Sequence, residues 1–249
     1  MNLLIVGYGN IGRHIYDELR VLSPQIYDPN IEEYKIIPNE KVDVAFICVP
    51  TDSLFDGSCD ISIVDESVKT IQATIIVIKS TVPVGTTDML SKKYGKNVIF
   101  SPEYYGTTQH SGLPDFLVLG GDTKCCATVA QIYYKIKSSS FRIIFTTTKT
   151  AELAKYMENC FLALKVTFCN EFATVASKYG ISYEILREIF IMDKRMGESH
   201  TFVLTDQPFY DSHCLNKDIP AYLHIADGDS PLIDAMHKIN KARKKNYAE

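Results

Sequence analysis

The 249-residue sequence lacks three features that would each point to a particular class of protein. No apolar run is as long as a membrane span, which argues against an integral membrane protein. Basic residues are not in excess, since 26 Lys and Arg stand against 30 Asp and Glu, and this argues against a general nucleic-acid surface. No leader precedes the first apolar segment, which begins at Leu3, so we expect no signal peptide.

Cysteine and histidine do not occur in the spacing of a disulfide framework or a metal site. The cysteine count is seven, an odd number, and Cys48 and Cys160 lie inside apolar segments. With no leader, this pattern predicts reduced thiols in a cytoplasmic compartment. Cys125 and Cys126 are adjacent, and Cys59 is isolated from any pair of histidines. We therefore predict no metal site.

The first dozen residues carry the strongest local signal. The apolar run from Leu3 to Val6 predicts a buried parallel strand, and an amphipathic segment from Arg13 to Leu22 predicts a helix. Between them lies a Gly-x-Gly-x-x-Gly turn, and strand, glycine turn and helix are the context in which this motif binds a dinucleotide. The candidate cofactor contacts in this turn are Gly7, Gly9, Asn10, Ile11 and Gly12.

Asp28 ends the second predicted strand, about 20 residues beyond the first glycine, where such sites place an acidic residue that binds the adenosine ribose. A carboxylate there favours NAD over NADP, because a 2′-phosphate would meet a negative charge. The third strand ends at the same edge of the sheet, so Val49, Pro50 and Thr51 are further candidate contacts. The alternative is a glycine turn in an α/β domain that binds no nucleotide.

Strand-like and helix-like segments alternate as far as residue 148, which is typical of an α/β fold. Apolar runs predict the further strands at 42–49, 73–79, 98–101, 116–119 and 141–145. This pattern predicts a Rossmann-type doubly wound parallel sheet that forms an NAD-binding domain over residues 1–148.

The spacing of apolar residues changes from residue 149 on. Apolar residues recur at three- and four-residue steps from Leu153 to Tyr179, which predicts a long helix ended by Gly180. Shorter helices are predicted at 183–192 and 231–245, with an irregular polar stretch between them at 197–208. We therefore predict a small helical domain over residues 149–249. The long helix is apolar over a wide arc, which predicts a homodimer.

Several blocks of sequence occur in an order that resembles a known family. They are the glycine turn, ValProThr at 49–51 with AspGlySerCysAspIleSer at 56–62, LysSerThrValProValGlyThrThr at 79–87, SerProGlu at 101–103, AlaGluLeuAlaLysTyrMetGluAsn at 151–159, LysArgMetGly at 194–197 and CysLeuAsnLysAsp at 214–218. Together they resemble the UDP-glucose/GDP-mannose dehydrogenase family, which oxidises a nucleotide-sugar alcohol to a carboxylate with two NAD. The resemblance implies NAD as cofactor, a nucleotide-sugar substrate such as UDP-glucose, a role in polysaccharide biosynthesis, and pairing of two copies through the long helix. We expect neither a nucleic-acid nor a membrane partner.

The resemblance also implies catalytic roles. Oxidation of an alcohol needs a base and a positive charge that stabilises the developing alkoxide. Lys155 would supply that charge, Asn159 would donate a hydrogen bond, and Asp218 would orient a water or a lysine. A thiolate at Cys214 would then add to the aldehyde and form a thioester after the second oxidation.

Four further residues follow from the same resemblance. Glu103, with Thr81 positioning water, would hydrolyse the thioester. Ser80 and Lys217 would contact NAD.

The chain departs from the family pattern in three places. Tyr210, Asp211, Ser212 and His213 stand where the family has Phe-Gly-Gly-Ser before its cysteine, so the pocket must be shaped differently. The second glutamate after the Pro-Glu pair is missing. The sequence stops at Glu249, where the family continues into a C-terminal domain that supplies much of the nucleotide-sugar site, so we expect a short form without that domain.

These departures leave alternatives open. The first is the family reaction, with a more open substrate site or with a partner chain that completes it. The second is a non-catalytic NAD-binding subunit with a regulatory or assembly role. The third is a two-electron hydroxy-acid or polyol dehydrogenase that uses Lys155 and not Cys214. The number of NADH formed per substrate distinguishes the three.

Overall fold

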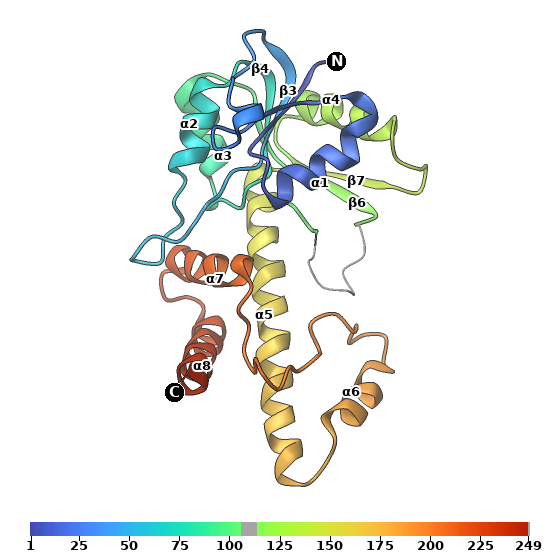
Figure 1. Cartoon of the computed structure of the whole chain (residues 1–249), viewed down its shortest axis with the longest axis vertical. Coiled ribbons are helices and arrows are strands. Elements are labelled where there is room, and N and C mark those ends of the chain that lie inside the picture. Colours follow the sequence, from blue (N-terminus) through green and yellow to red (C-terminus); the bar gives the residue numbers. More distant parts are fainter. Residues whose placement is uncertain (106–113, 249) are drawn as a thin grey trace. The chain divides into compact units, whose positions relative to one another are not determined.

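A computed structural model of the chain describes residues 1–105 and 114–248, in two compact units (Figure 1). Unit 1 comprises Met1–Leu54, Cys59–Tyr105 and residues 114–155. Unit 2 comprises Phe55–Ser58 and the chain from Tyr156 on. The position of the missing second glutamate lies outside the described residues.

Unit 1 contains a single twisted α/β sheet. Its described strands are β1 (Leu3–Val6), β2 (Gln25–Tyr27), β3 (Val42–Ile47), β4 (Ala73–Ile78), β5 (Val98–Phe100), β6 (Phe116–Gly120) and β7 (Arg142–Thr146), in the order β2-β1-β3-β4-β5-β6-β7. The first five run parallel, as do β6 and β7, which confirms the predicted Rossmann-type fold. The sheet is not wholly parallel, because β6 runs antiparallel to β5. A parallel connection needs a crossover, usually a helix, and the described residues between β5 and β6 contain none.

Helices cover both faces of this sheet. They are α1 (Asn10–Leu19), α2 (Ser62–Thr70), α3 (Thr86–Tyr94), α4 (Thr123–Tyr134) and the 3₁₀ turns η1 (Arg20–Leu22) and η2 (Glu32–Tyr34), with α5 (Thr148–Lys178) starting after β7. Successive strand side chains point to opposite faces, so Leu3 and Ile5 enter one apolar cluster and Leu4 and Val6 the other. The first cluster contains side chains of α1 and α4, and the second contains side chains of α2 and α3.

Unit 2 is helical in its described part. It comprises most of α5 and the helices α6 (Tyr183–Ile191), α7 (His213–Ala226) and α8 (Pro231–Ala248). Its core joins Cys160 and Ala163 of α5 with Leu215 and Ile219 of α7 and Met236 of α8. The sequence predicted no helix at the position of α7 and placed the Cys-x-x-Lys-Asp block in a loop, which was wrong.

The chain order reverses beside β1, because β2 lies on one side of it and β3 on the other. In open α/β sheets, ligands bind outside the carboxyl ends of the strands at such a reversal. The loops that leave the carboxyl ends of β1, β3, β4 and β5 begin at Gly7, Cys48, Lys79 and Ser101. The fold therefore brings the glycine turn to the edge of the sheet at which a cofactor is expected.

A buried carboxylate holds the start of α3 to α5. Glu152 is fully buried, and its carboxylate oxygens accept hydrogen bonds from the backbone N–H groups of Gly85 (2.6 Å) and Thr87 (2.9 Å). These N–H groups lie at a helix N-terminus, where no intrahelical acceptor is available. Burial raises the pKa of Glu152 above its ordinary value of 4.5.

We expect Glu152→Gln to lower the free energy of unfolding by about 2 kcal/mol, because the amide has one acceptor oxygen and would turn its NH₂ group toward the second N–H. The raised pKa means that the parent's folded state binds this proton more readily than its unfolded state does. The resulting stabilisation is present at acid pH and is lost as the pH rises through the raised pKa. Urea unfolding of both proteins from pH 4 to 7 measures the two effects, and the variant should lack this pH-dependent contribution. Equal stability of the two proteins throughout that range would contradict the assigned cap.

The long helix α5 carries an exposed apolar stripe within unit 2. Its exposed residues include Met157, Phe161, Phe168, Phe172 and Val175. By length and composition alone, α5 is also the one helix in the described chain that could cross a membrane, with 33% of its most apolar window buried. Core helices of soluble proteins pass the same test, so this is weak evidence.

Candidate functional site

The glycine turn has the geometry of a phosphate cradle. Helix α1 starts after Gly9 without a side-chain cap, so its first N–H groups are available to an anion. A Cβ at Gly12 would lie 1.9 Å from the carbonyl oxygen of Gly7, so only glycine permits this approach of helix and strand. A Cβ at Gly9 would meet nothing within 4 Å, which leaves open space in front of the helix. These residues fit a bound pyrophosphate.

Asp28 lies beside that cradle, as the sequence predicts. One carboxylate oxygen accepts a hydrogen bond from the N–H of Tyr8 (2.8 Å) and the other from the N–H of Asn30 (2.9 Å). Each oxygen keeps a further lone pair that can accept a hydroxyl of a ribose. Contact of this carboxylate with the adenosine ribose of NAD remains a prediction.

A hydrogen bond from Ser80, one of the candidate contacts, joins the loop after β4 to the loop after β3. The Ser80 hydroxyl donates to the carbonyl oxygen of Val49 at 2.7 Å, and Thr51 is buried while Pro50 is not. This hydrogen bond therefore brings the candidate contacts Val49 and Ser80 together within unit 1, and Thr51 follows Val49 on the same loop. Their contact with NAD remains a prediction.

Glu103 follows β5 and is almost fully buried. Its Oε1 accepts hydrogen bonds from the N–H groups of Tyr104 (2.8 Å) and Tyr105 (3.1 Å), and its Oε2 lies 3.4 Å from the Nζ of Lys79. The sequence indicated Glu103 as a site residue but did not indicate Lys79. The one signal for Lys79 was its position directly between an apolar strand and Ser80.

Tyr104 connects two candidate catalytic residues of unit 1. Its N–H binds Glu103, and the Nζ of Lys155 lies 5.1 Å from the centre of its ring. Such a placement of an ammonium over an aromatic face is attractive. Tyr104 therefore helps to orient Lys155, a role that the sequence did not indicate.

Unit 2 contains a hydrogen-bonded cluster around Asp218. The side-chain N–H of Asn159 donates to one oxygen of Asp218 at 2.6 Å, and the Nζ of Lys217 donates to the other at 2.6 Å. Asp218 is buried, so Lys217 is needed to compensate its charge and Asn159 to satisfy its second oxygen. The structure thus brings Asn159 to Asp218, which lies 59 positions further along the chain beside Lys217.

Cys214 lies in the first turn of α7 and is exposed, and it is the one exposed thiol among the seven. Lys217 and Asp218 follow at three and four residues, so they share a helix face with Cys214. The Cys-x-x-Lys-Asp spacing is therefore a helical spacing. Ser212 caps this helix by accepting a hydrogen bond from the N–H of Leu215.

The predicted site residues fall into two sets, one in each unit. Those of unit 1 are Gly7, Gly9, Asn10, Ile11, Gly12, Asp28, Val49, Pro50, Thr51, Ser80, Thr81, Glu103 and Lys155, and those of unit 2 are Asn159, Cys214, Lys217 and Asp218. The catalytic roles of these residues remain predictions.

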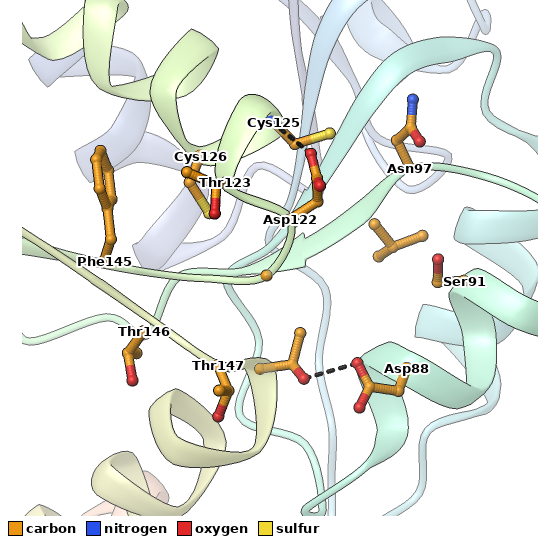
Figure 2. Close-up of a pocket in the computed structure, with 13 residues that line it drawn as sticks. Asp88, Ser91, Asn97, Asp122, Thr123, Cys125, Cys126, Phe145, Thr146 and Thr147 are labelled. Atoms are coloured by element: carbon orange, nitrogen blue, oxygen red, sulfur yellow. Dashed lines mark hydrogen bonds between the residues drawn. The ribbon is translucent and has the colours of Figure 1, made fainter.

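A cavity of about 620 Å³ lies elsewhere in unit 1 (Figure 2). It is lined by residues of α3, the start of β5, the β6–α4 turn and the β7–α5 turn. Asp88 and Asp122 line it, and the Asp88 carboxylate accepts a hydrogen bond from the hydroxyl of Thr148 at 2.7 Å. None of the predicted site residues lines this cavity.

Comparison with known proteins gives matches in both units. Residues 31–137 match the NAD binding domain of the UDP-glucose/GDP-mannose dehydrogenase family, and residues 149–242 match the central domain of the same family. The chain belongs to the UDP-glucose/GDP-mannose dehydrogenase family. The matched NAD binding domain and the fitting glycine cradle establish NAD as the cofactor of this family member.

Relatives within this family are longer than the chain. A UDP-glucose 6-dehydrogenase of Rhizobium meliloti is 32% identical over 225 residues, which are 82% of this chain and 51% of that protein. The chain thus spans about half the length of the curated relative. Solved structures of a UDP-glucose dehydrogenase from Pyrobaculum islandicum (TM-score 0.81, 22% identity) and a UDP-D-ManNAc dehydrogenase from Pyrococcus horikoshii (TM-score 0.78, 23% identity) each match 97% of this chain and 68% of their own. These two likenesses show the fold.

Proposed function

We propose that this family member catalyses the NAD-dependent oxidation of a nucleotide-sugar primary alcohol, such as that of UDP-glucose, to the carboxylate through a thioester on Cys214. The observation that carries the proposal is the helix face of α7, where an exposed thiol precedes a buried Asp218 that is bonded to Asn159 and Lys217. A purely structural helix has no need of this combination. Bound NAD⁺ would accept the hydride in each oxidation.

The side chains support separate parts of this reaction. Lys155 supplies a positive charge beside the developing alkoxide, and Asn159 adds a hydrogen-bond donor. The sulfur of Cys214 adds to the aldehyde carbon, and the resulting thiohemiacetal becomes a thioester on oxidation. Water then adds to the thioester carbonyl, Glu103 accepts the proton, and the C–S bond breaks to release the acid and the thiolate.

The test is the stoichiometry of NADH formed from UDP-glucose, with the products identified by mass. Two NADH and one uronate per substrate are expected. One NADH with an aldehyde or ketone would favour a two-electron dehydrogenase. No NADH, with NAD binding retained in a parallel titration, would favour a regulatory or assembly subunit.

We also propose that the chain acts as a homodimer that pairs through the exposed stripe of α5. The stripe presents Phe161, Phe168 and Phe172 to solvent, and such a continuous apolar surface on a monomer marks an interaction site. No disulfide joins the seven cysteines, which supports a reducing, cytoplasmic compartment for this assembly.

We expect the double substitution Phe161→Glu with Phe172→Glu to convert a dimer into a monomer, because two buried carboxylates would lose their hydration at the interface. Sedimentation at micromolar protein concentration measures the mass of both proteins. The matched control is Glu171→Gln, an exposed position on the same helix, which should remain dimeric. A parent chain that sediments as a monomer would rule out the proposed pairing.

A further inference from the structure

Lys79 is a buried lysine at the edge of the sheet that carries the candidate cofactor contacts. It follows β4 directly, and its side chain is 2% exposed. Its Nζ lies 3.2 Å from the Ser101 hydroxyl, 3.4 Å from the carbonyl oxygen of Pro102 and 3.4 Å from the Oε2 of Glu103. An ammonium group is almost never this buried unless an opposite charge compensates it.

Glu103 supplies that charge, and its two oxygens are held differently. Oε1 accepts two backbone hydrogen bonds, from Tyr104 and Tyr105. Oε2 is buried and accepts no hydrogen bond from the described residues, although it faces the ammonium of Lys79. Oε1 is therefore fixed by the backbone, while Oε2 keeps lone pairs that a water molecule can use.

The thiol and the phenols beside this pair carry no charge at neutral pH, while the Glu18 carboxylate, which also acts on Tyr105 and Tyr133, is paired with Lys137. Burial raises the pKa of the Cys48 thiol to about 12. The nearby Lys79 ammonium lowers this pKa, and the Glu103 carboxylate raises it. Burial also raises the pKa of the phenols of Tyr105 and Tyr133, and Glu103 adds to both shifts. Lys155 lies across the ring of Tyr104. Lys79 is thus the cation in direct contact with the Glu103 carboxylate.

We propose that Lys79 is a positioning residue, which compensates the charge of the buried Glu103 carboxylate and orients its Oε2 to accept a proton from water. The effect of Lys79 on turnover rests on the proposed function, because in that function Glu103 accepts the proton of the water that hydrolyses the thioester. The electrostatic coupling of Lys79 to Glu103 does not rest on it and can be measured in a protein without activity.

The first experiment measures stability against pH for Lys79→Met, Glu103→Gln and the double variant. In Lys79→Met a buried carboxylate lacks its counter-ion, so the folded state binds a proton at higher pH than the unfolded chain does. Its unfolding midpoint, relative to the parent, should therefore fall as the pH rises from 5 to 8. The double variant has no charge at either position, so it should be more stable than Lys79→Met at pH 8 and should lack this pH dependence. Lys92→Met, at an exposed position on α3, is the matched control.

The second experiment measures the pH profile of acid formation. The acidic limb of kcat in Lys79→Met should move up by about two pH units, while KM for the substrate changes little. A merely structural role would lower activity at all pH values alike, and this would overturn the positioning role. A parent that forms no acid would sink the proposed function alone, because the stability series still decides the coupling. Lys79→Met with the parent's pH dependence of stability would overturn the coupling itself.

Discussion

Replacing Cys214 with alanine is expected to abolish acid formation while the first oxidation continues. The alanine side chain cannot add to the aldehyde, so no thioester forms, and the rate of acid production should fall by more than about a thousandfold. The exposed position of Cys214 at the start of α7 leaves its sulfur accessible to a substrate. Product analysis by mass, after one and after many turnovers, distinguishes aldehyde from acid.

The matched control is Cys169→Ala, which removes a buried thiol of α5 in the same unit and should keep acid formation. Alkylation adds a readout that needs no turnover. In the native parent, iodoacetamide should react first at Cys214, and this fast phase should be absent from Cys214→Ala but present in Cys169→Ala. Acid production by Cys214→Ala at the parent's rate would refute the thioester route.

The substitution Gly12→Ala is expected to damage both the fold and the binding of NAD. Its Cβ would lie 1.9 Å from the Gly7 carbonyl oxygen and 2.9 Å from the Gly7 carbonyl carbon, which are backbone atoms with little freedom to move. Helix α1 would have to separate from β1, at a cost of about 3 kcal/mol of folding free energy. We expect NAD affinity to fall at least about a hundredfold, since the cradle depends on this packing.

Gly9→Ala separates the two effects. Its Cβ would meet nothing within 4 Å, and the φ of −77° suits any residue, so stability should change by less than about 0.5 kcal/mol. The methyl group would occupy the space in front of the helix, so NAD binding should weaken by about tenfold or more. Thermal unfolding and NAD titration of both variants check the prediction. Unchanged NAD affinity in both would show that the cradle does not bind the cofactor.

The sequence predicted the elements whose signal is local. The apolar runs located the strands to within two residues at each end, because a buried parallel strand needs continuous apolar side chains. Helix α1 begins at Asn10, ahead of the predicted start at Arg13, because its first turn lies inside the glycine motif itself. The reversal of β6 was not predicted, since strand direction leaves no mark on composition.

Helix α7 was missed for a physical reason. Pro220 lies in its interior, and because proline removes a helical hydrogen bond, residue propensity disfavours a helix there. Tertiary packing of Leu215 and Ile219 in the core of unit 2 outweighs that penalty. Because no helix was predicted over the Cys-x-x-Lys-Asp block, the shared helix face of Cys214, Lys217 and Asp218 was not predicted either.

The contacts that organise the candidate site were also invisible in the sequence. Glu152 binds the N–H of Gly85 across 67 positions, and Asn159 binds Asp218 across 59. Lys79 meets Glu103 in space, and Tyr104 contacts both Glu103 and Lys155. Such partnerships depend on the topology of the sheet and carry no local periodicity.

The junction between β5 and β6 has the shortest backbone pairing in the described sheet of unit 1. A single residue pair, Phe100 with Gly120, joins these strands, whereas β6 and β7 pair along their full length. Backbone amides of β6 and β7 can therefore open to solvent together without breaking the ladder from β1 to β5. Native-state hydrogen exchange should then show one opening free energy for the β6–β7 block and a higher one for the strands around the glycine cradle. The strands that carry the predicted cofactor contacts would then keep their pairing when the far edge of the sheet opens.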